Sequence, residues 1–208
     1  DEKLIVYDIE PIGDDVEAQR LVLALITADV NRMIAQDRSI IILDECWKIL
    51  SSETGSYLAA NLYRTVRKKG SAVWGISQSV QDWMDLPPST RQAILTNTSI
   101  ELFLRSKPLE AKSIAQAFSM NDAEMALLMG LQAVQGSYSD VLVSIENKRQ
   151  VVRLVPTGTE LWLATSDKRD LDLRRSYAER YPHLTCRELA WGLGRKYPNG
   201  APRMQEAA

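Results

Sequence analysis

Short apolar runs and longer amphipathic stretches alternate along the chain. Four apolar runs of strand length occupy residues 4–9, 40–43, 71–77 and 100–104. The stretches between them carry apolar residues every three or four positions, as amphipathic helices do. Strands that alternate with helices favour a parallel α/β sheet over the first half of the chain.

Helix boundaries can be placed from capping residues. The first helix is expected from a cap at Asp14 to about residue 36, and the second from Ser51 or Ser52 to residue 69, where Gly70 stops it. Further helices are expected over residues 89–97, 110–118 and 122–129.

The second half of the chain changes character. Residues 141–146 and 150–155 alternate apolar and polar positions around Asn147, which predicts a β-hairpin. A strand is expected over residues 161–165, followed by a helical tail that frays toward its end. We therefore divide the chain into residues 1–155, an α/β domain, and 156–208, an appendage of one strand and helices.

The second apolar run ends in two adjacent carboxylates. Four aliphatic residues are followed at once by Asp44 and Glu45, which predicts a strand buried on both faces with acids at the sheet edge where α/β folds place ligands. Phosphoryl transfer needs a carboxylate in the Mg²⁺ shell and another that orients water, the arrangement of a Walker B strand. The structural alternative is a buried strand that ends in a solvated turn.

Two further groups fit the same chemistry. Gln78 ends the third apolar run and should lie at the same edge, because the carboxyl ends of neighbouring parallel strands meet there. Arg64 and Arg67 fall on the outer face of the preceding helix, where an arginine finger for a neighbouring subunit would lie. Their structural alternatives are a strand-end amide bonded to a loop, and cations that favour the negative end of a helix dipole.

Composition excludes several classes of protein. A formal net charge of −2 gives no global field for nucleic acid, and the chain holds two cysteines and one histidine, too few for a standard structural zinc site. Sparse cysteine suits a reducing cytosol, and Cys46 has no histidine or second cysteine nearby, so we expect a small buried residue. No apolar run is long enough to span a bilayer.

One element of a nucleotide site is missing from the sequence. The phosphate cradle G-x-x-x-x-G-K-[ST] does not occur, and none of the ten glycines is followed by lysine. The chain also starts at Asp1 without an initiator methionine, close to the first apolar run. We therefore expect it to be part of a longer protein that supplies the other half of the site.

The segments IIILDECWKIL, LYRTVRKKGSAVWGISQS and NTSIELFLRSK, in this order, resemble the assembly ATPases of conjugative type IV secretion systems, the TraC/TrbE-like family. The resemblance covers residue 4 to about 155 and is strongest over 39–107. It implies a RecA-like P-loop fold, a mostly parallel sheet flanked by helices, in a hexamer that binds ATP and Mg²⁺. The family's Walker A segment lies upstream of Leu4.

The resemblance also implies roles for single residues. Asp44 would hold Mg²⁺ through a water molecule of its shell. Glu45 would activate the attacking water, and Gln78 would sense the γ-phosphate. Arg67, with Arg64 as second choice, would be the finger. The full-length protein would power apparatus assembly or substrate transfer at the cytoplasmic face of the inner membrane, in contact with inner-membrane subunits and companion ATPases, and this chain alone would be inactive.

Two other functions compete with this interpretation. A DNA-translocating hexameric pump or coupling protein would bind DNA in a strongly salt-dependent way, which the net charge of −2 does not favour. A non-enzymatic docking module would use the tail from Asp167 and keep the nucleotide residues as relics.

Overall fold

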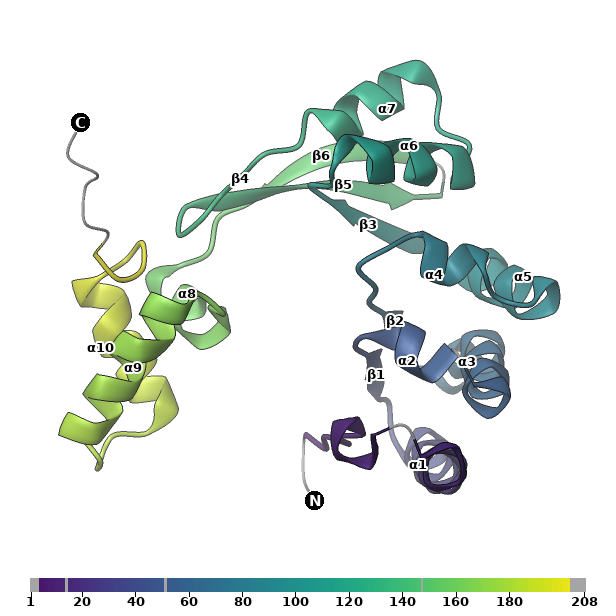
Figure 1. Ribbon diagram of the computed structural model, residues 1–208, viewed down its shortest axis with the longest axis horizontal. Helices are drawn as coiled ribbons and strands as arrows, with labels where there is room; N and C mark the ends of the chain where they lie inside the picture. Colours follow the sequence, from purple (N-terminus) through teal and green to yellow (C-terminus); the bar gives the residue numbers. More distant parts are fainter. Residues whose placement is uncertain (1–3, 14, 51, 147, 203–208) are drawn as a thin grey trace. The chain divides into compact units, whose positions relative to one another are not determined.

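The computed structural model describes residues 4–13, 15–50, 52–146 and 148–202. The chain forms two compact units (Figure 1). The first comprises residues 1–99 with 112–120, and the second residues 100–111 with 121–208. The predicted division at residue 155 stays a prediction.

The first unit holds a two-stranded parallel sheet and the helices around it. Its elements are, in chain order, η1 (Glu10–Ile12), α1 (Val16–Gln36), β1 (Ile40–Leu43), α2 (Cys46–Leu50), α3 (Glu53–Thr65), η2 (Val66–Lys69), β2 (Ala72–Gly75), α4 (Gln81–Met84) and α5 (Pro88–Asn97). Helix α6 (Pro108–Ala117) begins in the second unit and ends in the first.

Capping explains where the two long helices begin. The Asp15 carboxylate accepts hydrogen bonds from the backbone of Glu17 and Ala18 at the start of α1, and Asp14, the predicted cap, lies outside the described residues. Ser52 caps α3 through the Gly55 N–H, as predicted. Gly70 ends η2 in the left-handed conformation, with φ of 71°, which glycine adopts without steric cost.

The helices of this unit cover one face of the sheet (Figure 1). Ile41, Leu43 and Val73 point into the apolar clusters formed by α1, α3 and α5. On the opposite face Ile40 is 65% exposed and Ile42 is 57% exposed. The prediction that this strand is buried on both faces is therefore wrong for the described chain, because its helices all pack on the other side.

The strand predicted over residues 4–9 is also wrong. This segment is irregular and leads into the 3₁₀ helix η1. Leu4 and Val6 are 79% and 77% exposed. An apolar run becomes a strand only when a neighbouring strand accepts its backbone hydrogen bonds, and none of the strands in the described part pairs with it.

The second unit contains an antiparallel sheet and a helical end. Its remaining elements are β3 (Ile100–Leu104), α7 (Asp122–Met129), β4 (Ala133–Val134), β5 (Tyr138–Ile145), β6 (Lys148–Leu154), α8 (Gly158–Ala164), α9 (Lys168–Arg180) and α10 (Cys186–Lys196). Strand β5 pairs with β3, β4 and β6, and the β5–β6 hairpin is as predicted, although Asn147 lies outside the described residues.

The strands of the first unit pair in parallel, whereas the strands of the second unit pair antiparallel. The α/β class is confirmed, and β1 and β2 form the predicted parallel pair. Strand β3, expected as a further strand of the parallel sheet, instead runs antiparallel to β5, with Ile100 opposite Ile145 and Leu104 opposite Val141. This register places Phe103 opposite Leu142, and both side chains are buried on the same face of the sheet.

The helical end of the second unit packs around a tryptophan. Trp162 of α8 is fully buried against Ala190 and Leu193 of α10, and its Nε1–H donates to the Tyr197 carbonyl at 2.8 Å. The strand predicted over residues 161–165 is therefore wrong. Thr157 and Glu160 form a capping box that starts a helix instead, and the tail after it is helical as predicted. No helix of the described ranges is long and apolar enough to cross a membrane.

Candidate functional site

The carboxyl ends of β1 and β2 bring Glu45 and Gln78 together. The parallel ladder continues past the last strand residues, because the Ile76 N–H donates to the Leu43 carbonyl and the Cys46 N–H donates to the Ile76 carbonyl, both at 3.0 Å. The chains that leave the two strands therefore stay side by side for several residues. The predicted placement of Gln78 at the edge that carries Asp44 and Glu45 is confirmed.

Both carboxylate oxygens of Glu45 accept hydrogen bonds. Gln78 Nε2 donates to Oε1 at 2.5 Å, and the indole Nε1–H of Trp47 donates to Oε2 at 2.6 Å. These neutral donors orient the carboxylate. A water molecule that donates to Glu45 would thus meet a carboxylate held in one orientation.

The backbone of Glu45 is unusual. Its φ is +47°, in the left-handed region that residues other than glycine rarely adopt. Such strain concentrates at functional sites, where the surrounding structure keeps it in place. Here the strand ladder precedes Glu45, helix α2 begins at the next residue, and the side chain is bonded on both sides.

Asp44 lies next to this pair and is exposed to solvent. Its Oδ1 accepts a hydrogen bond from the Glu45 N–H at 3.0 Å. The other oxygen atom belongs to the class of hard ligand that Mg²⁺ prefers, and Mg²⁺ is commonly held by one or two carboxylates together with water and phosphate oxygens. Asp44 therefore fits a place in a Mg²⁺ shell, where it would be one ligand among several.

The two candidate arginines lie at the opposite edge of the sheet. Arg64 is in the last turn of α3 and Arg67 is in η2, directly before the start of β2. Glu45 and Gln78 follow the carboxyl ends of the strands. The residues beside the arginines lie at the amino ends, where the Ser71 N–H donates to the Val66 carbonyl and the Ala72 N–H donates to the Ser39 carbonyl. The structure thus does not bring either arginine to Glu45 of the same copy.

Cys46 takes no part in this chemistry. Its side chain is fully buried in the apolar cluster between the sheet, α3 and α5. Burial raises the pKa of the thiol to about 12, so the thiolate is scarce near neutral pH. The prediction of a small buried residue is confirmed.

Trp47 is the contact that sequence reasoning missed. The spacing Asp-Glu-x-Trp is visible in the sequence, but it does not reveal that Glu45 adopts a left-handed conformation or that the indole bonds to its carboxylate. Aromatic residues after a buried strand more often pack in the core. The sequence signal for this contact is the indole N–H of Trp47, two residues after Glu45.

Comparison with known proteins relates this chain to secretion proteins. A sequence model of the TraG P-loop domain matches residues 1–187. The chain is 23% identical over 128 residues to proteins described as "Type IV secretion system protein virB4" from Bartonella quintana and Bartonella henselae. The matched region covers 62% of this chain and 16% of each of those proteins.

A solved structure has the same fold. The structure of VirB4 of Thermoanaerobacter pseudethanolicus superimposes with a TM-score of 0.60 at 20% sequence identity. The match covers 77% of this chain and 44% of that chain. The chain thus spans less than half the length of the proteins that it matches.

Proposed function

The chain belongs to the TraG P-loop domain family, and from this premise we propose that it is part of the ATPase domain of a type IV secretion protein similar to VirB4. The full-length protein would hydrolyse ATP to drive apparatus assembly or substrate transfer. The observation that carries the proposal is the Glu45 carboxylate, held by Gln78 and Trp47 at the carboxyl end of two parallel strands.

Each group at this edge has a role in the proposed reaction. Glu45 accepts a hydrogen bond from the attacking water and orients it toward the γ-phosphate. Gln78 keeps that carboxylate in place and is long enough to bond a phosphate oxygen in its turn. Asp44 would hold Mg²⁺, which when bound offsets the charge of the phosphate oxygens.

A neighbouring subunit would complete the site. Arg67, or Arg64 as second choice, lies at the sheet edge away from Glu45, so it could reach a γ-phosphate only in another copy. Stabilisation of the transition state by an arginine supplied in trans is a known device of nucleotide hydrolysis. A ring, here a hexamer, provides that geometry at every interface.

The location and partners follow from the same proposal. A type IV secretion ATPase would work at the cytoplasmic face of the inner membrane, in contact with membrane subunits and companion ATPases. DNA is a weaker candidate partner, because the net charge of the chain is −2.

Turnover of the full-length protein tests the proposal. Glu45→Gln removes the water-activating carboxylate but keeps its shape, so we expect kcat to fall about 10²-fold or more. Glu17→Gln, on the exposed first turn of α1, is the matched control and should leave turnover unchanged. Equal turnover in the wild type and Glu45→Gln would remove Glu45 from the mechanism.

Subunit mixing tests the arginine. Arg67→Ala and Glu45→Gln should each be inactive alone, and mixtures should regain part of the activity, since some interfaces then pair an intact Glu45 with an intact Arg67. The same mixture with Arg64→Ala shows which arginine acts. Mixtures that stay inactive for both arginines would contradict a finger in trans.

The isolated 208-residue chain should hydrolyse almost no ATP. It contains no G-x-x-x-x-G-K-[ST] segment to cradle the phosphates. The measurement compares the ATP turnover of the isolated chain with that of the same chain carrying Glu45→Gln. Turnover clearly above the variant would contradict the requirement for a separate phosphate-binding segment.

A further inference from the structure

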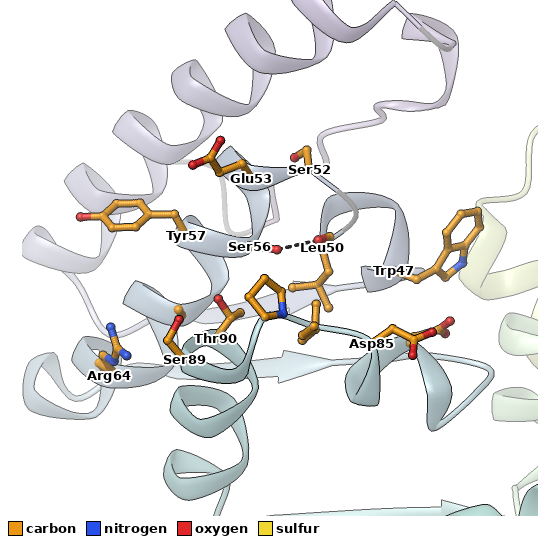
Figure 2. Close-up of a pocket in the computed structure, with 14 residues that line it drawn as sticks. Trp47, Leu50, Ser52, Glu53, Ser56, Tyr57, Arg64, Asp85, Ser89 and Thr90 are labelled. Carbon is orange, nitrogen blue, oxygen red and sulfur yellow. Dashed lines mark hydrogen bonds between the residues drawn. The ribbon is translucent and has the colours of Figure 1, made fainter.

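A groove runs along α3 on the side that faces α4 and α5 (Figure 2). Its volume is about 710 Å³, within the range of small-molecule pockets. On α3 it is lined by Ser56, Tyr57, Ala60 and Arg64, whose three- and four-residue spacing places them on one side of the helix. We call this cavity the α3 groove.

One end of the α3 groove carries hydrogen-bond donors. Figure 2 shows Arg64 of α3 at this end, together with Ser89 and Thr90 from the first turn of α5. Pro87 precedes this helix, and its start has no side-chain cap in the described structure. The positive end of the α5 dipole therefore lies at the same end of the groove as the Arg64 guanidinium.

Thr90 is the residue that points to a ligand. It lines the groove although it is only 8% exposed. Its N–H donates to the Pro87 carbonyl at 2.9 Å, but its hydroxyl group forms no hydrogen bond within the part of the chain that the structure describes. A hydroxyl group that is removed from water without a partner costs free energy, so its place in the groove wall indicates a polar group that binds there.

Arg64 and Ser89 are also available at this end. Neither side chain forms an ion pair or a hydrogen bond with a residue that the structure places. Asp85 lies at the other end of the groove, toward Trp47 (Figure 2), where its charge would repel an anion. The distribution of charge thus favours an anion at the Arg64 end.

We propose that the Arg64 end of the α3 groove binds a phosphoryl group. The guanidinium of Arg64 and the hydroxyl groups of Ser89 and Thr90 would donate to its oxygen atoms, and the α5 dipole would stabilise its charge. Arginine with hydroxyl groups at a helix N-terminus is a combination that suits a tetrahedral oxyanion. The phosphoryl group comes either from inorganic phosphate or from a nucleotide.

The length of the groove separates these two sources. An inorganic phosphate ion would occupy the Arg64 end alone. A nucleotide would extend along α3 toward Tyr57, whose ring is 73% exposed and which lies about 10 Å before Arg64 along the helix axis. A base could stack on this ring while its phosphoryl groups reach the arginine.

This site is separate from the catalytic edge of the sheet. It uses none of Asp44, Glu45 and Gln78, so the inference goes beyond the proposed ATPase reaction and does not depend on it. It also gives Arg64 a role within its own copy, which favours Arg67 as the arginine supplied in trans.

Calorimetric titration of the 208-residue chain tests the site. This chain has no G-x-x-x-x-G-K-[ST] segment, so a phosphoryl group that binds to it is not held by a phosphate cradle. The probes are inorganic phosphate, ADP and adenosine, at constant ionic strength and without Mg²⁺. We expect saturable binding of phosphate and of ADP, and none of adenosine, which lacks the phosphoryl group.

Single substitutions locate the binding. Arg64→Gln should weaken it about tenfold or more, and Ser89→Ala and Thr90→Val about threefold or more, because each removes one donor to a charged group. Lys68→Gln, at an exposed position after α3, removes the same charge as Arg64→Gln and is the matched control, which should bind as the wild type does. Circular dichroism of each variant shows that it is folded.

The outcomes decide both the site and the source. ADP that binds about tenfold more tightly than phosphate identifies a nucleotide, and ADP that binds equally or more weakly identifies inorganic phosphate. Failure of both to bind at millimolar concentration would overturn the site, and so would unchanged affinity in Arg64→Gln, Ser89→Ala and Thr90→Val. A loss in Lys68→Gln as large as that in Arg64→Gln would show a diffuse charge effect and overturn it as well.

Discussion

Gln78 and Glu45, 33 residues apart in the sequence, are joined by a hydrogen bond of 2.5 Å from Nε2 to Oε1. The contact exists because β1 and β2 are parallel neighbours, so that the residues leaving their carboxyl ends come together. The sheet thus converts two distant sequence positions into one polar site.

Removal of the Gln78 amide should lower kcat and leave KM for ATP almost unchanged. Gln78→Ala leaves Glu45 with fewer contacts to hold its carboxylate, and a hydrogen bond to a charged group is worth about 1.5–3 kcal/mol, so we expect kcat to fall about tenfold or more. KM for ATP should change little. Gln92→Ala, on the exposed face of α5, is the control, and a rise in KM with unchanged kcat would contradict the positioning role.

Two glycines of α10, two residues apart, should respond in opposite ways to alanine. A Cβ at Gly194 would lie 2.6 Å from the backbone of Gly158 and Thr159, whereas nothing lies within 4 Å of a Cβ at Gly192. We expect Gly194→Ala to lower the free energy of unfolding by about 1–3 kcal/mol and Gly192→Ala to raise it by up to about 1 kcal/mol. Urea titration followed by circular dichroism measures both.

Equal effects of these two substitutions would contradict the close approach of α8 and α10. Gly158→Ala is a further check, because a Cβ there would lie 2.5 Å from the Gly194 carbonyl oxygen. It should destabilise the chain in the same direction as Gly194→Ala.

The ion pair between Asp140 and Arg153 should make stability depend on acid pH. Arg153 Nε donates to Asp140 Oδ1 at 2.8 Å, and this hydrogen bond holds the pKa of Asp140 below its ordinary value of 3.8. A lowered folded-state pKa stabilises the fold above the unfolded value, and this contribution is lost as pH falls through the folded value. Thermal unfolding at pH 7 and pH 3 measures it.

The matched variant for that measurement is Asp140→Asn. It should lower the unfolding midpoint at pH 7 and show a smaller loss between pH 7 and pH 3 than the wild type. An identical pH dependence in both proteins would show that other carboxylates cause the acid effect.

The two cysteines should differ in reactivity. Burial raises the pKa of Cys46 to about 12, whereas Cys186 is exposed. Since the thiolate is the nucleophile, a thiol reagent at pH 8 should label one cysteine of the native 208-residue chain quickly and the second only after denaturation. Peptide mapping identifies the sites, and rapid labelling of Cys46 would contradict its burial.

The sequence predicted the parallel pair and its site because local signals agreed there. The aliphatic run of β1, the Ser52 cap, the Gly70 stop and the polar residue that ends the next run all point to strand, helix, strand. The parallel pairing of the two strands then places Glu45 and Gln78 at one edge.

Other elements could not be read from the pattern alone. Residues 4–9 have the composition of a strand but no partner strand in the described structure. Residues 161–165 also have the composition of a strand, but they belong to a helical segment in which Trp162 is buried against other helices. The capping box at Thr157 and Glu160 was the local signal for that helix. Composition does not reveal the left-handed conformation of Glu45 or its contact with Trp47.

The fate of bound ATP in a single turnover tests the central claim most directly. Full-length wild type and Glu45→Gln are loaded with a substoichiometric amount of labelled ATP, quenched with acid over time, and the bound nucleotide is identified. The account predicts that the wild type converts it to ADP while Glu45→Gln binds equally well and retains ATP. Conversion at the same rate in both would show that Glu45 does not activate water.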